Sequence, residues 1–218
     1  MEYQPFVSIL IPTLNEEKYI KDCLQSVIYQ TYPTELIEIL VLDGGSKDRT
    51  NEIVNYFRGN YHNIKLIENK KQIQSAAFNL GVERAKGEII IRLDAHSIYD
   101  CNYIQLCVKN LSDHEVGNVG GVCKAIPGTN TLMAKVIAHI NNSPFGLGGA
   151  TYRRGKKKQL AKTVPFGAFH AELIREVGKM NENLPRSEDI EYNLRIRSLG
   201  YKIILDPDIR FQYFSRTT

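Results

Sequence analysis

The 218-residue sequence has no apolar run close to the ~20 residues that a membrane-spanning helix needs. Its N-terminus, MEYQPFVSILIP, lacks the basic start and long apolar core of a secretory signal. The four cysteines form no C-x-x-C pair and fall in segments typical of helices or strands, so we expect free thiols in a reducing cytoplasm. These cysteines are Cys23, Cys101, Cys107 and Cys123. From the sequence we therefore predict a soluble, cytoplasmic protein.

Two common nucleotide-binding motifs are also absent. The G-x-G-x-x-G fingerprint of dinucleotide-binding units does not occur, since DGGSKD has a different spacing and follows the second predicted strand. No G-x-x-x-x-G-K-[ST] loop occurs either. These absences argue against a dehydrogenase and against a P-loop kinase or ATPase.

The charge balance is only mildly basic. The chain carries 28 Lys and Arg against 24 Asp and Glu, which gives a net charge of +4 and a pI near 8.8. Nucleic-acid-binding domains are usually far richer in Lys and Arg, so we predict no nucleic-acid partner. An anionic small ligand or a membrane surface fits this balance equally well.

Alternating strand-like and helix-like segments predict a single α/β domain with a mostly parallel, twisted sheet flanked by helices. The strand-like runs are FVSILIP, IEILVLD, NIKLIE, GEIIIRLD and, near the end, YKIILD. We expect helices after Asn15 as N-cap, after DGGSKDRT, over residues 74–86 and 131–140, and in RSEDIEYNLRIRSLG up to Gly200. The apolar stripe of the first helix should face the sheet; its members are Ile20, Cys23, Leu24, Val27 and Ile28.

Polar residues close several predicted strands at one edge of the sheet. Asp43 ends the second strand and Asp94 the fourth, and ligands of open α/β sheets bind at these carboxyl ends. Asp94 and His96 should lie on the same side of an extended strand end and are suited to Mg²⁺ or Mn²⁺. The alternative for this D-x-H pair is a solvated strand end.

Neighbouring strand ends add groups to the same edge. Asn15, Glu16, Asp43 and Gly44 are candidates to bind a nucleotide base and ribose. Ser46 and Asp48 are better explained as a turn and cap for the following helix.

A third acidic group, SEDIEY, begins the last predicted helix. Glu188, Asp189 and Glu191 are favoured there by the helix dipole, which is a sufficient structural explanation. A carboxylate in this position can also act as a general base toward a hydroxyl. The spacing alone does not choose between these roles.

Five segments in the same order resemble the inverting family 2 glycosyltransferases of the GT-A fold, which is Rossmann-like. They are VSILIPTLNEE, ILVLDGGSKDRT, SAAFNLGVERAKGEIIIRLDAHS, PFGAFHAELIREVG and SEDIEYNLRIRSLGYKIILDP. RLDAHS and VPFGAF look closest to the succinoglycan-biosynthesis type of exopolysaccharide glucosyltransferase. The resemblance spans nearly the whole chain.

The resemblance implies transfer of a hexose from a UDP-sugar to a hydroxyl of a lipid-linked glycan. Asp94 and His96 match the family's D-x-D metal position, Asp189 matches its base, and Glu188 would support that base. The implied donor contacts are Pro12, Thr13, Asn15, Glu16, Asp43, Gly44, Ser75, Asn79, Arg92 and Asp94. Residues 1–125 would bind the nucleotide sugar and residues 126–218 the acceptor. Mn²⁺ or Mg²⁺ would be required, and the setting would be the cytoplasmic face of the cell membrane.

Three departures from the family pattern affect this expectation. His96 replaces the usual second Asp, Phe78 stands where many members carry an Arg, and Phe214 stands where many carry a His. Arg92 is a candidate to replace the missing Arg. We also expect that a C-terminal, membrane-associated part has been removed after Thr218.

Two other functions are alternatives to sugar transfer. A binding protein that holds a nucleotide sugar without turnover would fit the altered metal position, although the retained Asp189 argues against it. A nucleotidyltransferase would need a Gly- and Arg-rich loop that PTLNEEKYI lacks.

The segment from 143 to 163 is long and without periodicity. The basic run RRGKKK, residues 153–158, is either a solvated loop or a site for anionic lipid or for the diphosphate of a lipid-linked acceptor. FGLGGATY is either a lid over the donor or a flexible connection.

Overall fold

The structure, a computed structural model, describes residues 3–143, 155–184 and 186–215. In the first half, four strands run parallel, as predicted, and their order in the sheet is β3-β2-β1-β4. They are β1 (Val7–Thr13), β2 (Ile37–Asp43), β3 (Ile64–Glu68) and β4 (Ile89–Arg92). The crossovers contain α1 (Ile20–Ile28), a short 3₁₀ helix (Thr34–Leu36), α2 (Thr50–Asn60) and α3 (Gln74–Arg84). The apolar runs and helical spacing of the sequence were therefore sufficient to predict the parallel strands and the three α-helices of this half, but not the order of the strands.

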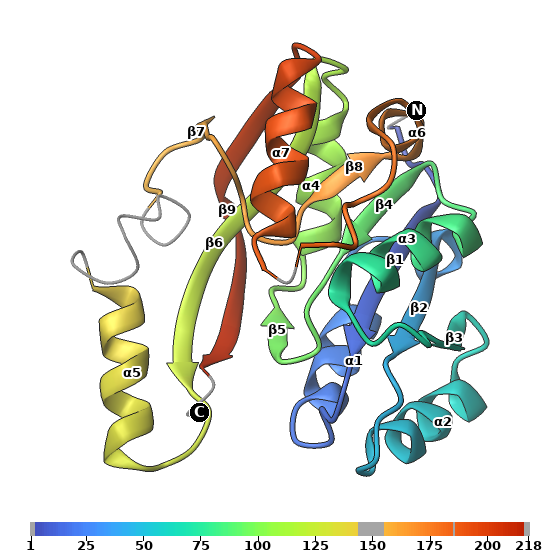
Figure 1. The fold of residues 1–218 in the computed structure, drawn as a ribbon, viewed down its shortest axis with the longest axis vertical. Coiled ribbons are helices and arrows are strands. Elements are labelled where there is room, and N and C mark those ends of the chain that lie inside the picture. The colour runs from blue at the N-terminus through green and yellow to red at the C-terminus, as the bar shows by residue number, and fades with distance from the viewer. Residues whose placement is uncertain (1–2, 144–154, 185, 216–218) are drawn as a thin grey trace.

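The second half continues the same sheet but mixes strand directions. β8 (Ala168–His170) runs antiparallel to β4 and to β6 (Val116–Pro127), whereas β6 and β9 (Lys202–Ser215) are parallel. β5 (Ser97–Tyr99) and β7 (Gln159–Leu160) pair antiparallel with β9. The remaining helices are α4 (Tyr103–Leu111), α5 (Leu132–Asn142), α6 (Ala171–Val177) and α7 (Glu188–Ser198). Among the described residues the result is one mixed sheet in an α/β fold (Figure 1).

Two apolar cores lie on the two faces of this sheet because successive strand residues point to opposite sides. Ile9 and Ile11 of β1 pack with α1, α2 and α4 on one face. Leu10 packs with α3, α6 and α7 on the other. The sheet is thus covered by helices on both faces, which explains why its central strands read as continuous apolar runs.

The first helix begins later than predicted. Tyr19, and not Asn15, is the residue before α1, and Asn15 instead adopts a left-handed backbone conformation with φ of 56°. Asparagine tolerates this region better than most residues, so the chain turns here before the helix begins. The predicted inward stripe is otherwise confirmed: Ile20, Cys23, Leu24 and Val27 are buried, and Ile28 packs partly against the same core.

Ser46 and Asp48, which were predicted to form a turn and a cap before α2, have different roles in the structure. Asp48 Oδ1 accepts a hydrogen bond from the Thr50 amide at 3.0 Å and so supports the start of α2, although Arg49 and not Asp48 is the residue directly before the helix. Ser46 does not bond to α2 and donates instead to Asp43 Oδ1 at 2.5 Å.

β9 is longer than the predicted strand YKIILD and brings residues 210–215 back to the sheet edge beside β5 and β6. β6 lies very close to β9 at Gly121, where a Cβ would lie 1.9 Å from the Ile209 carbonyl oxygen. The pairing of the two strands is irregular at this point, between Gly120 and Val122. A glycine is therefore required for the two strands to pass each other.

None of the helices in the described part of the chain is both long and apolar enough to cross a membrane. The lid proposed for FGLGGATY, residues 145–152, lies outside the described residues, as do Arg153 and Arg154 of the basic run. Lys156, Lys157 and Lys158 are described and exposed.

Candidate active site

Two loops at the carboxyl ends of β1 and β2 are tied together by hydrogen bonds. The Asn15 amide donates to Ser46 Oγ at 2.8 Å, and the Lys47 amide donates to Asn15 Oδ1 at 2.8 Å. The Glu16 amide donates to Thr50 Oγ1 at 2.7 Å. The exposed Asn15 thus braces the loops, and it borders neither of the two cavities described below.

Asp43 is buried and organises the loop that follows β2. Its carboxylate accepts from the amides of Gly45 and Ser46, each at 3.0 Å, and from Asn51 Nδ2 at 3.1 Å. A carboxylate that accepts several bonds from one loop fixes the conformation of that loop. Asp43 therefore positions its neighbour Gly44, which borders the first cavity.

The first cavity has a volume of about 140 Å³ and lies at this carboxyl edge. Five of the predicted donor-site residues line it: Pro12, Thr13, Glu16, Gly44 and Asp94. The other lining residues are Leu14, Leu42, Asn69, Gln72, Ile73, Gln74 and Ala77. Mixed apolar walls with a few polar groups are typical of a small-molecule site.

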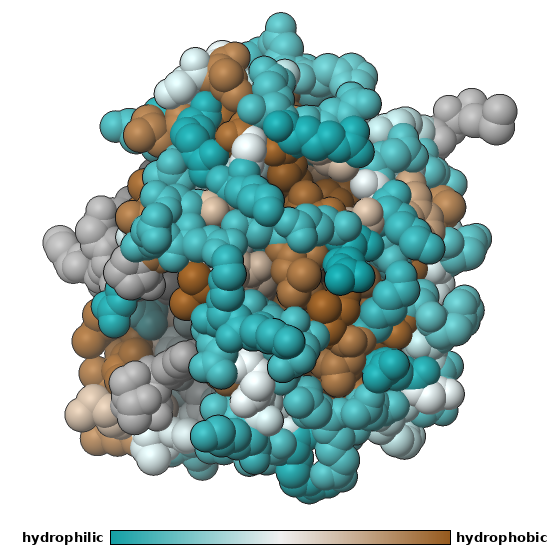
Figure 2. Space-filling view, turned by 45° about the vertical axis from the view of Figure 1, so that its right-hand side comes forward, coloured by the Kyte–Doolittle hydropathy of each residue, from teal (hydrophilic) through white to brown (hydrophobic). Residues whose placement is uncertain are grey.

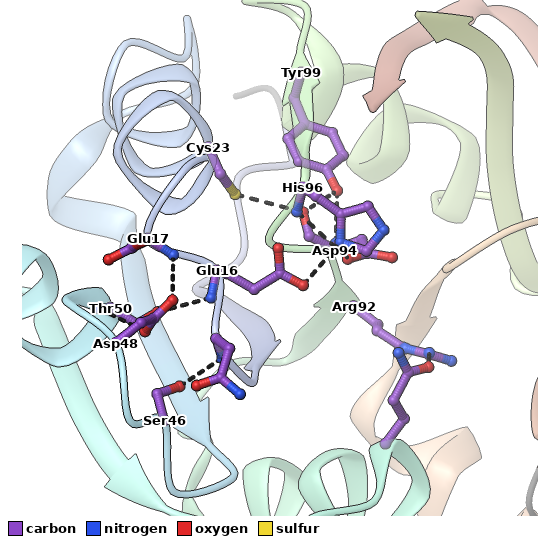
Figure 3. A network of polar contacts seen from close by, with 12 residues as sticks. Glu16, Glu17, Cys23, Ser46, Asp48, Thr50, Arg92, Asp94, His96 and Tyr99 are labelled. Atoms are coloured by element: carbon purple, nitrogen blue, oxygen red, sulfur yellow. Dashed lines mark hydrogen bonds and ion pairs between the residues drawn. The ribbon is translucent and has the colours of Figure 1, made fainter. Parts of the chain in front are cut away.

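Asp94 and His96 lie close together, but a turn at 95–96 brings them there and not the extended strand end that we predicted. His96 Nδ1 lies 2.8 Å from Asp94 Oδ1 and 3.1 Å from Glu16 Oε1, as Figure 3 shows. Burial alone would lower the pKa of His96, but the two carboxylates raise it to about 11. His96 is therefore a buried imidazolium between two acids.

The same cluster keeps Asp94 ionised. Burial alone would raise the pKa of Asp94, whereas the hydrogen bond and charge of His96, together with Arg92, lower it below its ordinary value. The Tyr99 hydroxyl accepts a hydrogen bond from the Asp94 amide at 2.6 Å and holds the turn in place. Asp94 is thus a fixed anion at the edge of the first cavity.

Among the described residues, no three His, Cys, Asp or Glu side chains are arranged to hold a metal ion by themselves. Mg²⁺ is often bound by one or two carboxylates and completes its coordination with water and substrate phosphates, so such a trio is not needed. Asp94 fits this role. His96 Nδ1 already contacts two carboxylates, and its buried Nε2 has no hydrogen-bond partner among the described groups. Metal binding by His96 requires loss of the ring proton and stays a prediction.

A second cavity of about 360 Å³ adjoins the first. Asp94 and Gln74 line both cavities. The predicted residues in the second cavity are Arg92, Asp94, His96, Glu188 and Asp189, and the others are Gln74, Cys123, Pro165, Phe166 and Tyr213. Acidic groups separated by 95 positions in the sequence are thus brought to one space.

Arg92 is buried and links the two halves of the chain at this cavity. Its Nη2 donates to Gln74 Oε1 at 2.6 Å and to Glu188 Oε1 at 3.1 Å. Beside this ion pair, burial and the charge of Glu188 raise the pKa of Asp189 above the ordinary aspartate value, and Arg92 opposes this in part. A carboxylate with a raised pKa is a stronger base once it is deprotonated.

Four predicted donor contacts, Asn15, Asp43, Ser75 and Asn79, line neither of these cavities, and Asp43 acts instead by positioning Gly44 as described above. Asn79 is buried, and its Nδ2 donates to the Met180 carbonyl and to Glu182 Oε1, each at 3.0 Å, which ties α3 to the segment before α7. Ser75 Oγ is buried without a hydrogen-bond partner among the described residues. Asn15 braces the loops as described above.

The departures from the family pattern have structural explanations. Phe78 is fully buried against Phe169 and Tyr192, at ring separations of 5.9 and 5.7 Å, so it belongs to the core. Phe214 stacks on Tyr19 at 4.7 Å, and its amide donates to the His96 carbonyl at 3.0 Å. Phe214 therefore supports the turn that carries His96.

Sequence reasoning missed several lining residues, chiefly Gln74, Cys123, Phe166 and Tyr213. Gln74 begins the helix that follows β3, so its place at the carboxyl edge was a detectable signal. The other three depend on long-range pairing of β6, β8 and β9, for which the sequence carries no local signal.

The mixed sheet with helices on both faces is the GT-A fold. Among solved structures, the fold matches a mannosyltransferase, PcManGT from Pyrobaculum calidifontis, in complex with GDP-Man and Mn²⁺, with a TM-score of 0.74, 24% identity and coverage of 97% of this chain and 57% of that one. It also matches GalNAc-T7 with UDP, GalNAc and Mn²⁺, with a TM-score of 0.77, 20% identity and coverage of 99% and 45%.

The chain belongs to glycosyl transferase family 2: its residues 8–178 match the sequence pattern of this family. It is 30% identical over 98% of its length to a dolichyl N-acetyl-alpha-D-glucosaminyl phosphate glucuronosyltransferase of Methanococcus voltae. It is 29% identical over 95% of its length to the succinoglycan biosynthesis protein ExoA of Rhizobium meliloti, which agrees with the predicted resemblance. The chain spans 68% and 63% of the lengths of these two relatives.

Proposed function

We propose that the chain is the catalytic domain of an inverting, metal-dependent glycosyltransferase that moves a hexose from a UDP-sugar to a glycan hydroxyl. The observation that carries this proposal is the junction of the two cavities at Asp94, with the carboxylate of Asp189 in the second. The nucleotide would lie in the first cavity, its diphosphate at Asp94, and the acceptor hydroxyl beside Asp189.

Asp189 would act as the base of this reaction. It would accept the proton of the acceptor hydroxyl as that oxygen attacks the anomeric carbon from the face opposite the diphosphate, so the anomeric centre inverts. Arg92 would hold Glu188 at the start of α7 and so position Asp189, through the 3.1 Å contact between Arg92 and Glu188. Arg92 is also a candidate to contact the donor in place of the Arg that Phe78 replaces.

Asp94 would be the protein ligand of Mn²⁺ or Mg²⁺, with His96 as a second candidate. A bound metal would neutralise charge on the leaving diphosphate. Glu16 and His96 would hold Asp94 in the orientation that the 2.8 Å contact between His96 and Asp94 gives it. Solved relatives of this fold that contain Mn²⁺ with GDP-Man or UDP support the need for a metal.

The two halves would divide the substrates between them. Every residue that lines the first cavity falls within 1–125, which supports this half as the nucleotide-binding part. The second cavity also takes residues from 126–218, including Asp189 and Tyr213, as a site for the acceptor requires. Glu188 and Asp189 would thus face a donor held mainly by the other half.

The acceptor would be a lipid-linked glycan, and the product an exopolysaccharide or cell-surface polysaccharide made at the cytoplasmic face of the membrane. The Methanococcus voltae relative, a glucuronosyltransferase named for a dolichyl N-acetyl-alpha-D-glucosaminyl phosphate, supports a lipid-linked acceptor. ExoA of Rhizobium meliloti, a succinoglycan biosynthesis protein, supports polysaccharide assembly.

The test is a transfer assay with a panel of UDP-hexoses and GDP-mannose, with Mn²⁺, and with polyprenyl-phosphate-linked sugars as acceptors. We expect one UDP-sugar to be consumed, and Asp189→Ala to lower turnover by roughly 10²- to 10⁴-fold while nucleotide affinity is kept. Undiminished turnover in Asp189→Ala would refute the base assignment. Tight donor binding without turnover in the wild type would favour a silent nucleotide-sugar-binding protein.

A further inference from the structure

Helix α5 presents four of its five large apolar side chains to the outside, with Ile137 half-buried, and its two alanines to the protein. Ala134 and Ala138 are buried, at 0% and 4% exposure. The outward side chains are Leu132, Met133, Val136 and Ile140, with exposures of 79%, 64%, 43% and 51%. Leu132, Val136 and Ile140 are four residues apart, so they form one stripe along the helix. These four residues are called the α5 apolar face.

The α5 apolar face belongs to a well-anchored helix and not to a frayed end. The Thr131 hydroxyl caps the helix by accepting a hydrogen bond from the Ala134 amide at 3.2 Å. The Asn142 side chain bonds to both the amide and the carbonyl of Ala125 in β6, at 2.9 and 2.7 Å. Figure 1 shows α5 at the margin of the molecule beside β6, and Figure 2 shows brown side chains at the corresponding lower left.

Such a face is costly in water, because exposed apolar surface loses roughly 25 cal/mol per Å² relative to burial. A helix of a water-exposed domain normally turns its large apolar residues inward. The reverse arrangement, on a helix whose other side is already packed, indicates a surface that is covered by something else.

The charge around α5 indicates what covers it. Residues 116–171 contain no Asp or Glu and eight Lys and Arg, which leaves 20 Lys and Arg against 24 Asp and Glu in the rest of the chain. Lys135 lies on α5, Lys124 lies on the adjacent β6, and both are exposed. A basic, acid-free segment that also carries an apolar helix face is the pattern of a helix that lies in the interface of an anionic bilayer.

We infer that the α5 apolar face is a docking surface for a phospholipid bilayer with anionic headgroups. The four apolar side chains would enter the boundary between headgroups and acyl chains, and Lys124 and Lys135 would meet the lipid phosphates. A second copy of the chain is a poorer occupant, since a two-fold contact would bring two basic, acid-free segments together. The inference goes beyond the proposed sugar transfer and does not depend on it.

Vesicle flotation tests this inference without any enzymatic readout. We expect the wild-type chain to bind vesicles of phosphatidylcholine with phosphatidylglycerol, and to bind vesicles of phosphatidylcholine alone far less. Val136→Glu/Ile140→Glu should bind the anionic vesicles at least about tenfold more weakly, since it places two charges in the interface. Lys124→Gln/Lys135→Gln should lose the preference for the anionic lipid.

The matched control is Tyr56→Glu/Leu199→Glu, which makes the same charge change at exposed apolar positions elsewhere, at 72% and 47% exposure. This control should bind vesicles like the wild type, and all variants should melt like it. Equal binding by Val136→Glu/Ile140→Glu and the wild type, or no binding of the wild type to either vesicle, would overturn the inference. So would a concentration-dependent dimer that the α5 double variant abolishes.

Discussion

At the scale of single residues, the site is built from buried charges that neutralise one another. Glu16 and Asp94 share the imidazolium of His96, and Glu188 pairs with Arg92. Removing His96, or either member of the Arg92–Glu188 pair, leaves an uncompensated buried charge, which costs more than the pair itself contributes. Asp189 is the acid in the second cavity whose pKa is raised, so it is the group whose protonation should limit activity.

The pH dependence of transfer follows from this raised pKa. Activity requires deprotonated Asp189, so kcat/KM should fall as the pH is lowered through a pKa above the ordinary aspartate value. Glu188→Gln removes a cause of the raised pKa and leaves the charge of Arg92, so the acid limb of the pH profile should move to lower pH. An acid limb that does not move in Glu188→Gln would contradict the assignment of this limb to Asp189.

Glu38 supplies a pH-dependent contribution to stability away from the site. It is buried, accepts from Ser8 Oγ at 2.7 Å and pairs with Lys65 at 2.8 Å. Burial alone would raise its pKa, but Lys65, Ser8 and the Lys86 amide lower it below the ordinary glutamate value. The contribution is therefore complete above the unfolded pKa and is lost as the pH falls through the lower, folded pKa.

Glu38→Gln should lower the free energy of unfolding at neutral pH by roughly 1–3 kcal/mol, because the hydrogen bonds of a buried charged group are weakened. Urea denaturation at neutral and acidic pH measures this, and the difference from the wild type should shrink as the pH falls. Glu52→Gln, which removes an exposed ion pair with Arg49, is the control and should unfold like the wild type. A pH-independent deficit in Glu38→Gln would contradict the account.

At the scale of elements, helices and strands that follow from a local sequence pattern were predictable, whereas those that depend on long-range strand pairing were not. β1 to β4 and their helices follow from apolar runs and helical spacing; the predicted strand ends lie close to the observed ones, whereas α1 begins at Ile20, later than predicted. β5, the C-terminal part of β9 (residues 210–215) and the turn at 95–96 were not predicted, because their conformation depends on long-range pairs such as Ser97 with Tyr213. The prediction of Asn15 as an N-cap was wrong because asparagine is favoured both at N-caps and in the left-handed conformation that it adopts here.

The crossing of β6 and β9 yields a prediction at this scale. Gly121→Ala would place a methyl group against the Ile209 carbonyl, so the strands must separate, and we expect a loss of at least ~3 kcal/mol in unfolding free energy or failure to fold. Gly59→Ala in α2 is the control, since a Cβ there meets nothing within 4 Å. It should stabilise the chain by about 0.5–1 kcal/mol through helix propensity. Urea titration of both variants checks the pair, and equal midpoints would contradict the close contact.

At the scale of the whole molecule, site residues that are far apart in the sequence come together at the carboxyl edge of the sheet. Glu16, Asp94 and Asp189 come from three distant segments, yet the two cavities that they line share Asp94 and Gln74. The sequence allowed these acids to be predicted as site residues because each one follows a strand or begins a helix. The contacts between these residues were not predictable from the sequence. His96 lies between two acids only because β1 and β4 are adjacent strands in the folded sheet.

The most direct test of the account is calorimetric titration of UDP into the chain with Mn²⁺, with Mg²⁺ and with a chelator, for the wild type and for Asp94→Ala. Asp94→Asn, which keeps the size of the side chain, serves with thermal melting to show that the fold is retained. We predict metal-dependent UDP binding that Asp94→Ala abolishes. Absence of UDP binding under every condition, or binding that neither the chelator nor Asp94→Ala changes, would contradict a UDP-sugar site at the junction of the two cavities.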